Sequence, residues 1–215
     1  MLEILFEDAH VLVVRKPVGL LSESTPAGDG LADLLAAHCG GYIGVIHRLD
    51  RGVGGVMVYA KTKTAAAHLS EQVRSREMQK VYLALVHGRP EAESGRLCDL
   101  LFHDRRSNKT FVADRARHGV KEALLDYAVE QERADSPLGA LSLLRVQLLT
   151  GRTHQVRVQF ASRRHPLVGD GKYGAPESGP IGLFCTQLIF SHPISGERLS
   201  FEILPSGEPW ELLSV

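Results

Sequence analysis

The spacing of apolar residues predicts a chain built mainly of short strands with a few helices. Alternation or short apolar runs predict strands over residues 2–6, 11–14, 43–46, 56–59, 80–86, 122–130, 141–149, 181–190 and 198–204. Leucines at 31, 34 and 35 share one helical face, and an apolar stripe over residues 62–76 follows a capping threonine, Thr62 or Thr64. The class predicted is α+β, with a mixed, mostly antiparallel β-sheet and flanking helices.

Four further segments complete this pattern. In residues 153–162 the apolar positions alternate as in a strand, whereas Thr153, Arg157 and Ala161 would share a helical face. Residues 103–121 form a polar interruption in which basic side chains outnumber acidic ones, and residues 209–213 fit a last helical turn. The segment 169–174 is a glycine-rich loop that lacks the spacing of a phosphate-binding loop.

Composition narrows the class of protein. The 215 residues suit a single domain, and the 25 basic and 25 acidic residues argue mildly against indiscriminate nucleic-acid binding. Three widely spaced cysteines without a CxxC pair indicate buried reduced thiols, not a disulfide framework or a thiolate zinc site. The chain has neither a signal peptide at its start nor a membrane-length apolar run. We therefore expect a cytoplasmic protein with no membrane partner.

Two clusters carry the candidate chemistry. The sequence HRLDRGVGG at residues 47–55 places Asp50 on a glycine-rich connection between two apolar runs. An aspartate there is more often a turn residue than a catalyst. The sequence TGRTHQVRV at residues 150–158 raises the chance of catalysis, because its arginines can grip carboxylates or phosphates in bidentate geometry.

These clusters resemble two motifs of the RluA family of pseudouridine synthases. KPVGL at residues 16–20 and KVYLA at residues 80–84 resemble two more, so four motifs stand in the order of that family between about residues 11 and 204. One departure is visible: the family usually has Thr-Ser-Gly where this chain has Val53-Gly54-Gly55. The missing hydroxyls put in doubt any side-chain hydrogen bonds that they would make in the loop.

The resemblance implies a fold, a substrate and catalytic residues. It implies the pseudouridine synthase catalytic fold with a central cleft over residues 1–215, without an N-terminal S4 module, acting on a uridine in ribosomal or transfer RNA. Asp50 would be the nucleophile, Tyr82 would lie against the target base, and Arg157, in preference to Arg152, would keep the desolvated carboxylate ionised. The target nucleotide must be flipped out, and Arg48 would fill the space that it leaves.

The remaining candidates concern substrate binding. His47 would shape the loop, with a general base as the weaker alternative; Arg152 and His154 would support the site or contact the RNA backbone. Arg105 and Arg106 would contact phosphates, although a solvated basic loop is the competing interpretation. No metal or other cofactor is expected, since the ten histidines show no HxH or HxxxH pairing, and a monomer is the simplest oligomeric state.

Two other function classes compete with this one. A non-catalytic RNA-binding protein could use the same fold and basic loop without turnover, and only activity on RNA that contains uridine separates the two. A histidine-assisted phosphoesterase rests on scattered His and Asp residues, and its activity would depend on a metal. The sequence leaves open which uridine is modified and whether the nucleophile attacks the sugar or the base.

Overall fold

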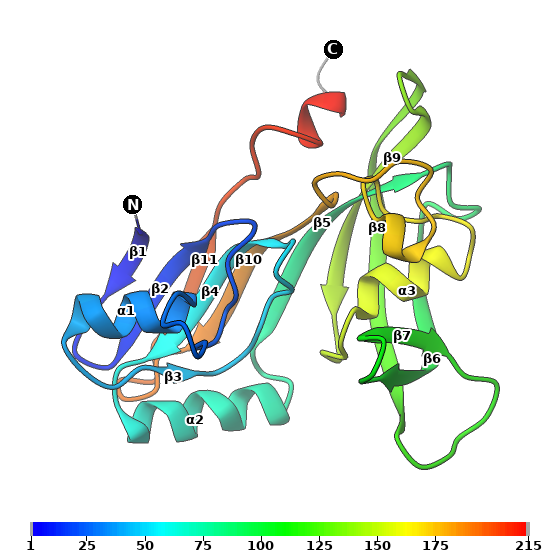
Figure 1. Ribbon diagram of the computed structural model, residues 1–215. Coiled ribbons are helices and arrows are strands. Elements are labelled where there is room, and N and C mark those ends of the chain that lie inside the picture. Colours follow the sequence, from blue (N-terminus) through cyan, green and yellow to red (C-terminus); the bar gives the residue numbers. More distant parts are fainter. Residues whose placement is uncertain (1, 214–215) are drawn as a thin grey trace. The chain divides into compact units, whose positions relative to one another are not determined.

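The computed structural model describes residues 2–213, which fold as two compact units (Figure 1). The first unit comprises the chain up to Lys80 together with Cys185–Pro205, and the second comprises Val81–Phe184 and the chain from Ser206 onward. Within residues 2–213, no helix is both long enough and apolar enough to cross a bilayer.

The first unit is built on a sheet. Its strands are β1 (Glu3–Glu7), β2 (Val11–Lys16), β3 (Gly44–Val45), β4 (Gly54–Ala60), β10 (Leu183–Ser191) and β11 (Arg198–Glu202). The order β1-β2-β4-β10 forms the sheet, with β3 also paired to β4 and β11 to β10. The β1–β2, β2–β4 and β10–β11 pairs are antiparallel. Strand β4 is buried along its whole length, as its apolar sequence requires.

Two helices belong to this unit: α1 (Leu31–Cys39) and α2 (Lys63–Arg74). The Thr62 hydroxyl caps α2 by accepting a hydrogen bond from the Ala65 amide, and α1 ends at Gly40 in the left-handed conformation. Ala65 and Leu69 of α2 join a buried cluster with valines of β2 and β4. Both helices predicted from apolar spacing are therefore confirmed, with α2 ending two residues earlier than expected.

The second unit contains a second run of strands. These are β5 (Gln79–His87), β6 (Ser94–Asp104), β7 (Lys109–Val112), β8 (Val120–Ser136) and β9 (Gly139–Leu148). They lie in the order β5-β9-β8-β6-β7, and the β6–β7, β6–β8 and β8–β9 pairs are antiparallel. This arrangement, with the helices, confirms the α+β class.

The helical elements of the second unit are α3 (Gln155–Ala161) and two 3-10 helices, Gly171–Tyr173 and Trp210–Leu213. Val158 of α3 and Tyr173 form a buried cluster with Leu101 of β6 and Ala123 of β8. The helical interpretation of residues 153–162 is confirmed, because continuous burial of residues 154–160 satisfies both the alternating and the helical pattern.

Three expectations need correction. Strand β6 was not predicted, because its mixture of exposed and buried positions has no clean alternation. The polar segment 103–121 is not one loop, since it contains β7, which forms by pairing with β6. The cysteines are not all buried: Cys98 is exposed on β6, and Cys39 is half-buried.

Candidate active site

Asp50 lies in the loop between β3 and β4, and a buried lysine holds that loop. The Lys16 side chain at the end of β2 is fully buried. Its ammonium group donates hydrogen bonds to the carbonyl oxygens of Pro17 (2.9 Å), Arg51 (3.4 Å) and Val53 (2.7 Å). Two of these carbonyls, those of Arg51 and Val53, directly follow Asp50 in the chain, so the lysine fixes the backbone just after the aspartate.

Further hydrogen bonds tie the same loop to the segment after β2. The Ser22 hydroxyl donates to the Leu49 carbonyl (2.9 Å) and accepts from the Leu49 amide (3.1 Å). The Gly19 amide donates to the Arg51 carbonyl (2.8 Å), and the Arg51 Nε returns a bond to the Gly19 carbonyl (2.9 Å). The residues on both sides of Asp50 are thus fixed from two directions, which is the support that a reacting side chain on a loop requires.

The electrostatics of Lys16 and Asp50 are linked. Burial lowers the pKa of the Lys16 ammonium group to about 8, and the nearby Asp50 carboxylate opposes this shift. The sequence motif KPVGL predicted no such contact. The sequence feature that indicates the contact is recognised only with the structure known: Lys16 ends a strand that begins with four apolar residues, and once buried it must find polar partners inside the fold.

The departure from the family at Val53-Gly54-Gly55 leaves this support intact. Val53 contributes its carbonyl oxygen to Lys16, a contact that any side chain permits, and its own side chain is buried. Gly55 has a φ of 134°, and a Cβ on it would lie 2.3 Å from the Cys185 carbonyl oxygen. Position 55, which only glycine can occupy without strain, is therefore a glycine in this chain.

The two residues before Leu49 differ in exposure. His47 is buried, and its Nε2 accepts a hydrogen bond from the Val58 amide (3.4 Å). Burial, together with the charge of Lys80, lowers the pKa of His47 to about 3, so the ring is neutral at neutral pH and suits loop support better than general-base catalysis. Arg48 is largely exposed, and its Nη1 contacts both carboxylate oxygens of Glu23 (3.1 and 3.2 Å).

In the second unit, Arg157 projects from α3 into a buried ion pair. Its Nε donates to Asp170 Oδ2 (2.7 Å) and its Nη2 to Asp170 Oδ1 (2.8 Å). The side chains of Arg157 and Asp170 are 7% and 1% exposed. The guanidinium carbon lies 5.0 Å from the centroid of the Tyr173 ring. Neither Asp170 nor Tyr173 was predicted as a site residue, because the glycine-rich segment around them shows only that it is a turn.

The other candidate residues of the second unit are held by hydrogen bonds or by burial within the protein. His154 is buried in the left-handed conformation (φ 53°), and its Nδ1 lies 2.8 Å from the Tyr173 hydroxyl. The Arg152 Nε donates to the Glu122 carbonyl (2.8 Å). Tyr82 is buried on β5, with 5% of its surface exposed. The roles in RNA contact expected for Arg152 and His154 stay predictions.

Arg105 and Arg106 lie in the exposed turn between β6 and β7. The Asp104 carboxylate shapes the turn by accepting hydrogen bonds from the Arg106 amide (3.0 Å) and the Ser107 hydroxyl (2.7 Å). The carbonyl oxygen of the residue before β7, Asn108, accepts a bond from Lys172 (2.6 Å). The turn therefore presents both arginine side chains to solvent from an ordered backbone.

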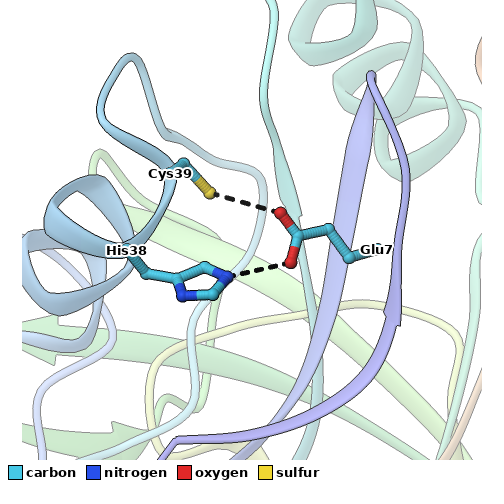
Figure 2. Close-up of side chains that lie close together, drawn as sticks. All are labelled: Glu7, His38 and Cys39. Atoms are coloured by element: carbon cyan, nitrogen blue, oxygen red, sulfur yellow. Dashed lines mark hydrogen bonds and ion pairs between the residues drawn. The ribbon is translucent and has the colours of Figure 1, made fainter.

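A separate group of metal-ligand residue types lies at the end of β1. Among residues 2–213, donor atoms of Glu7, His38 and Cys39 lie within 4.8 Å of one another (Figure 2). The Lys61 ammonium group already occupies the Glu7 carboxylate at 2.7 Å, and hydrogen bonds from Lys61 and His38 lower the pKa of Glu7. Burial raises the pKa of the Cys39 thiol, which disfavours the thiolate that a metal needs. These contacts tie β1 to the end of α1.

The structure thus gathers the predicted site residues into two groups. Asp50, Arg48 and His47 belong to the first unit, and Tyr82, Arg152, His154 and Arg157 belong to the second. Their assignments as catalytic and substrate-binding residues, including the pairing of Asp50 with Arg157, stay predictions. Lys16, Asp170 and Tyr173 are additions that the structure makes to these groups.

Comparison with known proteins identifies the family. Residues 10–162 match the family model described as RNA pseudouridylate synthase. An uncharacterized RNA pseudouridine synthase of Aquifex aeolicus is 36% identical over 94% of this chain and 69% of its own length. The dual-specificity RNA pseudouridine synthase RluA of Vibrio vulnificus is 35% identical over 90% of this chain and 79% of its own length.

A solved structure agrees on the fold. Human RNA pseudouridylate synthase domain containing 1 superposes with a TM-score of 0.79 at 24% identity, covering 95% of this chain and 84% of the human one. Most of the curated relatives are longer, and the chain spans about two thirds of their length. The resemblance carried by the four sequence motifs is confirmed: the chain belongs to the RluA family of RNA pseudouridine synthases.

Proposed function

We propose that this chain isomerises a particular uridine of ribosomal or transfer RNA to pseudouridine, with Asp50 as the nucleophile. The observation that carries the proposal is the support of the Asp50 loop: a buried ammonium group binds the carbonyls of Arg51 and Val53 just after the aspartate, and Ser22 holds Leu49 just before it. A surface turn with no chemical task does not need a buried cation behind it, because burying a charge is costly.

The reaction breaks the bond between C1′ of the ribose and N1 of uracil and forms a bond from C1′ to C5. N1 gains a proton and C5 loses one, so the product is an isomer and no oxidant or cofactor enters the balance. The Asp50 carboxylate supplies the electron pair that attacks the sugar or the base, and leaves again when the new bond forms. Both points of attack are compatible with a carboxylate on this loop.

The other residues bind and orient. Arg157 keeps the carboxylate ionised when water is excluded, and Tyr82 lies against the uracil ring, where stacking contributes about 1–3 kcal/mol. Arg48, exposed beside the nucleophile loop, fills the place of the extruded nucleotide. His47, Arg152 and His154 support these groups, and Arg105 and Arg106 contact phosphates.

The setting of the reaction is part of the proposal. A relative in Zymomonas mobilis is named ribosomal large subunit pseudouridine synthase D, and the Vibrio vulnificus relative is named as having dual specificity. These names support RNA as the substrate and leave the particular uridine open. We take the working form to be a monomeric cytoplasmic catalytic domain that needs no cofactor.

The test compares Asp50→Asn with Asp29→Asn, a change at an exposed carboxylate of the same unit. Each variant is incubated with RNA from cells that lack this protein, and pseudouridine is mapped and quantified. We expect Asp50→Asn to form none while its affinity for RNA stays within a few-fold of wild type, and Asp29→Asn to act normally. Substantial activity in Asp50→Asn would refute the assignment of the nucleophile.

The same experiment decides on the non-catalytic alternative. If the wild-type protein binds the RNA and produces no pseudouridine at any position, the chain is an RNA-binding protein on the same fold. A chelator added to the wild-type reaction tests metal dependence, and we expect the activity to persist.

A further inference from the structure

We infer that Asp170 is a positioning residue for the reaction: it holds Arg157 side-on, so that a different edge of the guanidinium faces the catalytic carboxylate. This inference rests on the proposed function, in which Arg157 is the counter-ion of Asp50. The contacts of Arg157 with Asp170 and Tyr173 lie within the second unit.

The first observation is the geometry of the ion pair. Asp170 receives hydrogen bonds from Nε and Nη2 at 2.7 and 2.8 Å, which is the bidentate side-on arrangement. A guanidinium is planar, with five N–H groups in fixed directions. Once its Nε/Nη2 edge is bound to a buried carboxylate, the direction of the Nη1/Nη2 edge is set as well. The partner of Arg157 in the proposed function is the Asp50 carboxylate, and we assign that carboxylate to this second edge.

The second observation is that Tyr173 limits movement of the guanidinium. The Arg157 guanidinium carbon lies 5.0 Å from the ring centroid, within the range of a cation–π contact. The ring is itself fixed, because its hydroxyl accepts a hydrogen bond from the Thr110 amide (2.8 Å) and lies 2.8 Å from His154 Nδ1. The arginine is thus held along one edge and against an aromatic ring.

The third observation is the rigidity of the turn that carries Asp170. Its amide donates to the Leu167 carbonyl (3.1 Å), and its carbonyl accepts from the amides of Tyr173 (2.9 Å) and Ala175 (3.2 Å). The preceding residue, Gly169, has a φ of 76°, and a Cβ there would lie 2.2 Å from the Pro180 carbonyl oxygen. The backbone therefore presents the carboxylate in one direction only.

The chain offers a matched control in the same unit. Asp99 forms a second bidentate pair, with Arg163 just after α3, at 2.8 and 3.0 Å. Both pairs are bidentate, although Asp99 binds Nη1 and Nη2 of a partly exposed arginine, and Asp99 lies outside the proposed site. Asp99→Asn therefore reports what the loss of such a pair does to the fold, without a part in catalysis.

The experiment is a double-mutant cycle in single-turnover rate on an RNA substrate identified by the mapping above. Its members are wild type, Asp170→Asn, Arg157→Ala and the double variant, with RNA affinity and melting temperature measured for each. We expect Asp170→Asn to lower the rate by about 10- to 100-fold, the order of loss caused by misplacing a group by roughly 1 Å. RNA affinity should change less than threefold, and the melting temperature should fall at least as far as it does for Asp99→Asn, because the Arg157–Asp170 pair is more deeply buried.

The decisive comparison is made in the Arg157→Ala background. If Asp170 acts through the arginine, Asp170→Asn lowers the rate no further there. A rate loss that multiplies with that of Arg157→Ala overturns the inference, and so does a wild-type rate in Asp170→Asn. Asp50→Asn separates this failure from failure of the proposed function. If Asp50→Asn is inactive while the effects of the substitutions at 157 and 170 are independent, only the role of Asp170 is rejected.

A second variant covers the case in which Asp170→Asn does not fold. Asp170→Glu keeps the charge and the ion pair but moves the carboxylate by one methylene group. We expect a folded protein whose rate is reduced while its affinity for RNA is retained. A wild-type rate in Asp170→Glu, measured below its melting temperature, shows that the position of this carboxylate does not matter and overturns the inference.

Discussion

Lys16 in the first unit and Arg157 in the second are buried cations held by opposite means. The Lys16 ammonium group binds neutral carbonyl oxygens, whereas the Arg157 guanidinium binds a buried carboxylate side-on. Burial lowers the pKa of Lys16 to about 8, while a guanidinium stays protonated in proteins. The loop of Asp50, the proposed nucleophile, is therefore held by a charge that can titrate near physiological pH, whereas Arg157, the proposed counter-ion, carries a charge that cannot.

The largest effect should come from the fixed charge. Arg157→Ala removes a buried charge that faces the reacting carboxylate in the proposed function, and we expect a loss of rate on the order of 10²–10³-fold. Arg152→Ala removes a side chain whose Nε donates a hydrogen bond to the Glu122 carbonyl, and we expect a loss of less than about tenfold. Single-turnover rates of the two variants decide between them. The reverse order would assign the counter-ion to Arg152.

Replacing the lysine should lower the rate more than the stability. Lys16→Met deprives three carbonyl oxygens of their donor, which costs about 1–3 kcal/mol for each one left buried and unpaired. It also removes a buried charge, which offsets much of that cost. We expect the rate to fall by about 10- to 100-fold through displacement of Asp50, with a smaller change in the free energy of unfolding.

Lys61→Met is the control for this replacement. Lys61 also binds a carbonyl oxygen, that of Asp8 (2.7 Å), together with the Glu7 carboxylate, but it lies outside the Asp50 loop. It should lose stability and keep the wild-type rate on folded protein. If Lys16→Met keeps the wild-type rate as well, the loop does not depend on its buried cation.

The pH profile should show the titration of Lys16 directly. As the pH rises through about 8 the ammonium group loses its charge, so the ratio of the wild-type rate to the Lys16→Met rate should fall toward one. Using this ratio cancels the ionisation of the uracil base, which both enzymes share. A ratio that stays constant across this range would show that the charge of Lys16 has no part in activity.

The contribution of Lys16 to stability should change with pH in the opposite direction to its contribution to the rate. The folded-state pKa of Lys16, about 8, lies below its ordinary value of 10.5, so between these values the unfolded chain binds more protons. The contribution of this residue to the free energy of unfolding therefore rises with pH across that window, and it is constant below it. As the pH rises from about 8, the effect of Lys16 on the rate should fall while its contribution to the free energy of unfolding rises. Urea unfolding of wild type and Lys16→Met at several pH values would measure that contribution.

The sequence was most informative where local pattern and tertiary packing agree. The apolar runs that became β2 and β4 were sufficient, because these strands are buried almost throughout. The leucine spacing predicted α1, of which Leu31 and Leu35 are buried while Leu34 is exposed. Strand β7 was missed for the opposite reason. It has basic and exposed residues, and only the neighbouring strand β6 makes it a strand.

The candidate site divides in the same way. Asp50 and Arg157 could be named as candidates because they lie in motifs with a recognisable order, and their catalytic roles stay predictions. The groups that hold them could not, because Lys16 meets carbonyls 35 and 37 residues away and Asp170 meets an arginine 13 residues away. A lysine near an apolar strand and an aspartate between glycines have many possible partners, and only the fold selects one.

The smallest effect should come from the exposed arginines, which no buried partner holds in place. Reversing both charges, with Arg105→Glu and Arg106→Glu, should weaken RNA binding on the order of tenfold at low salt and reduce the salt dependence of log K by about 1 to 2. A matched reversal of two exposed charges on α2, Lys63→Glu and Arg74→Glu, corrects for the change in net charge. Because phosphate contacts supply position without chemistry, the single-turnover rate at saturating RNA should stay within about threefold of wild type. Equal effects of the two double variants at low salt would mean that the β6–β7 turn makes no direct contact with RNA, and that only the overall charge of the chain matters there.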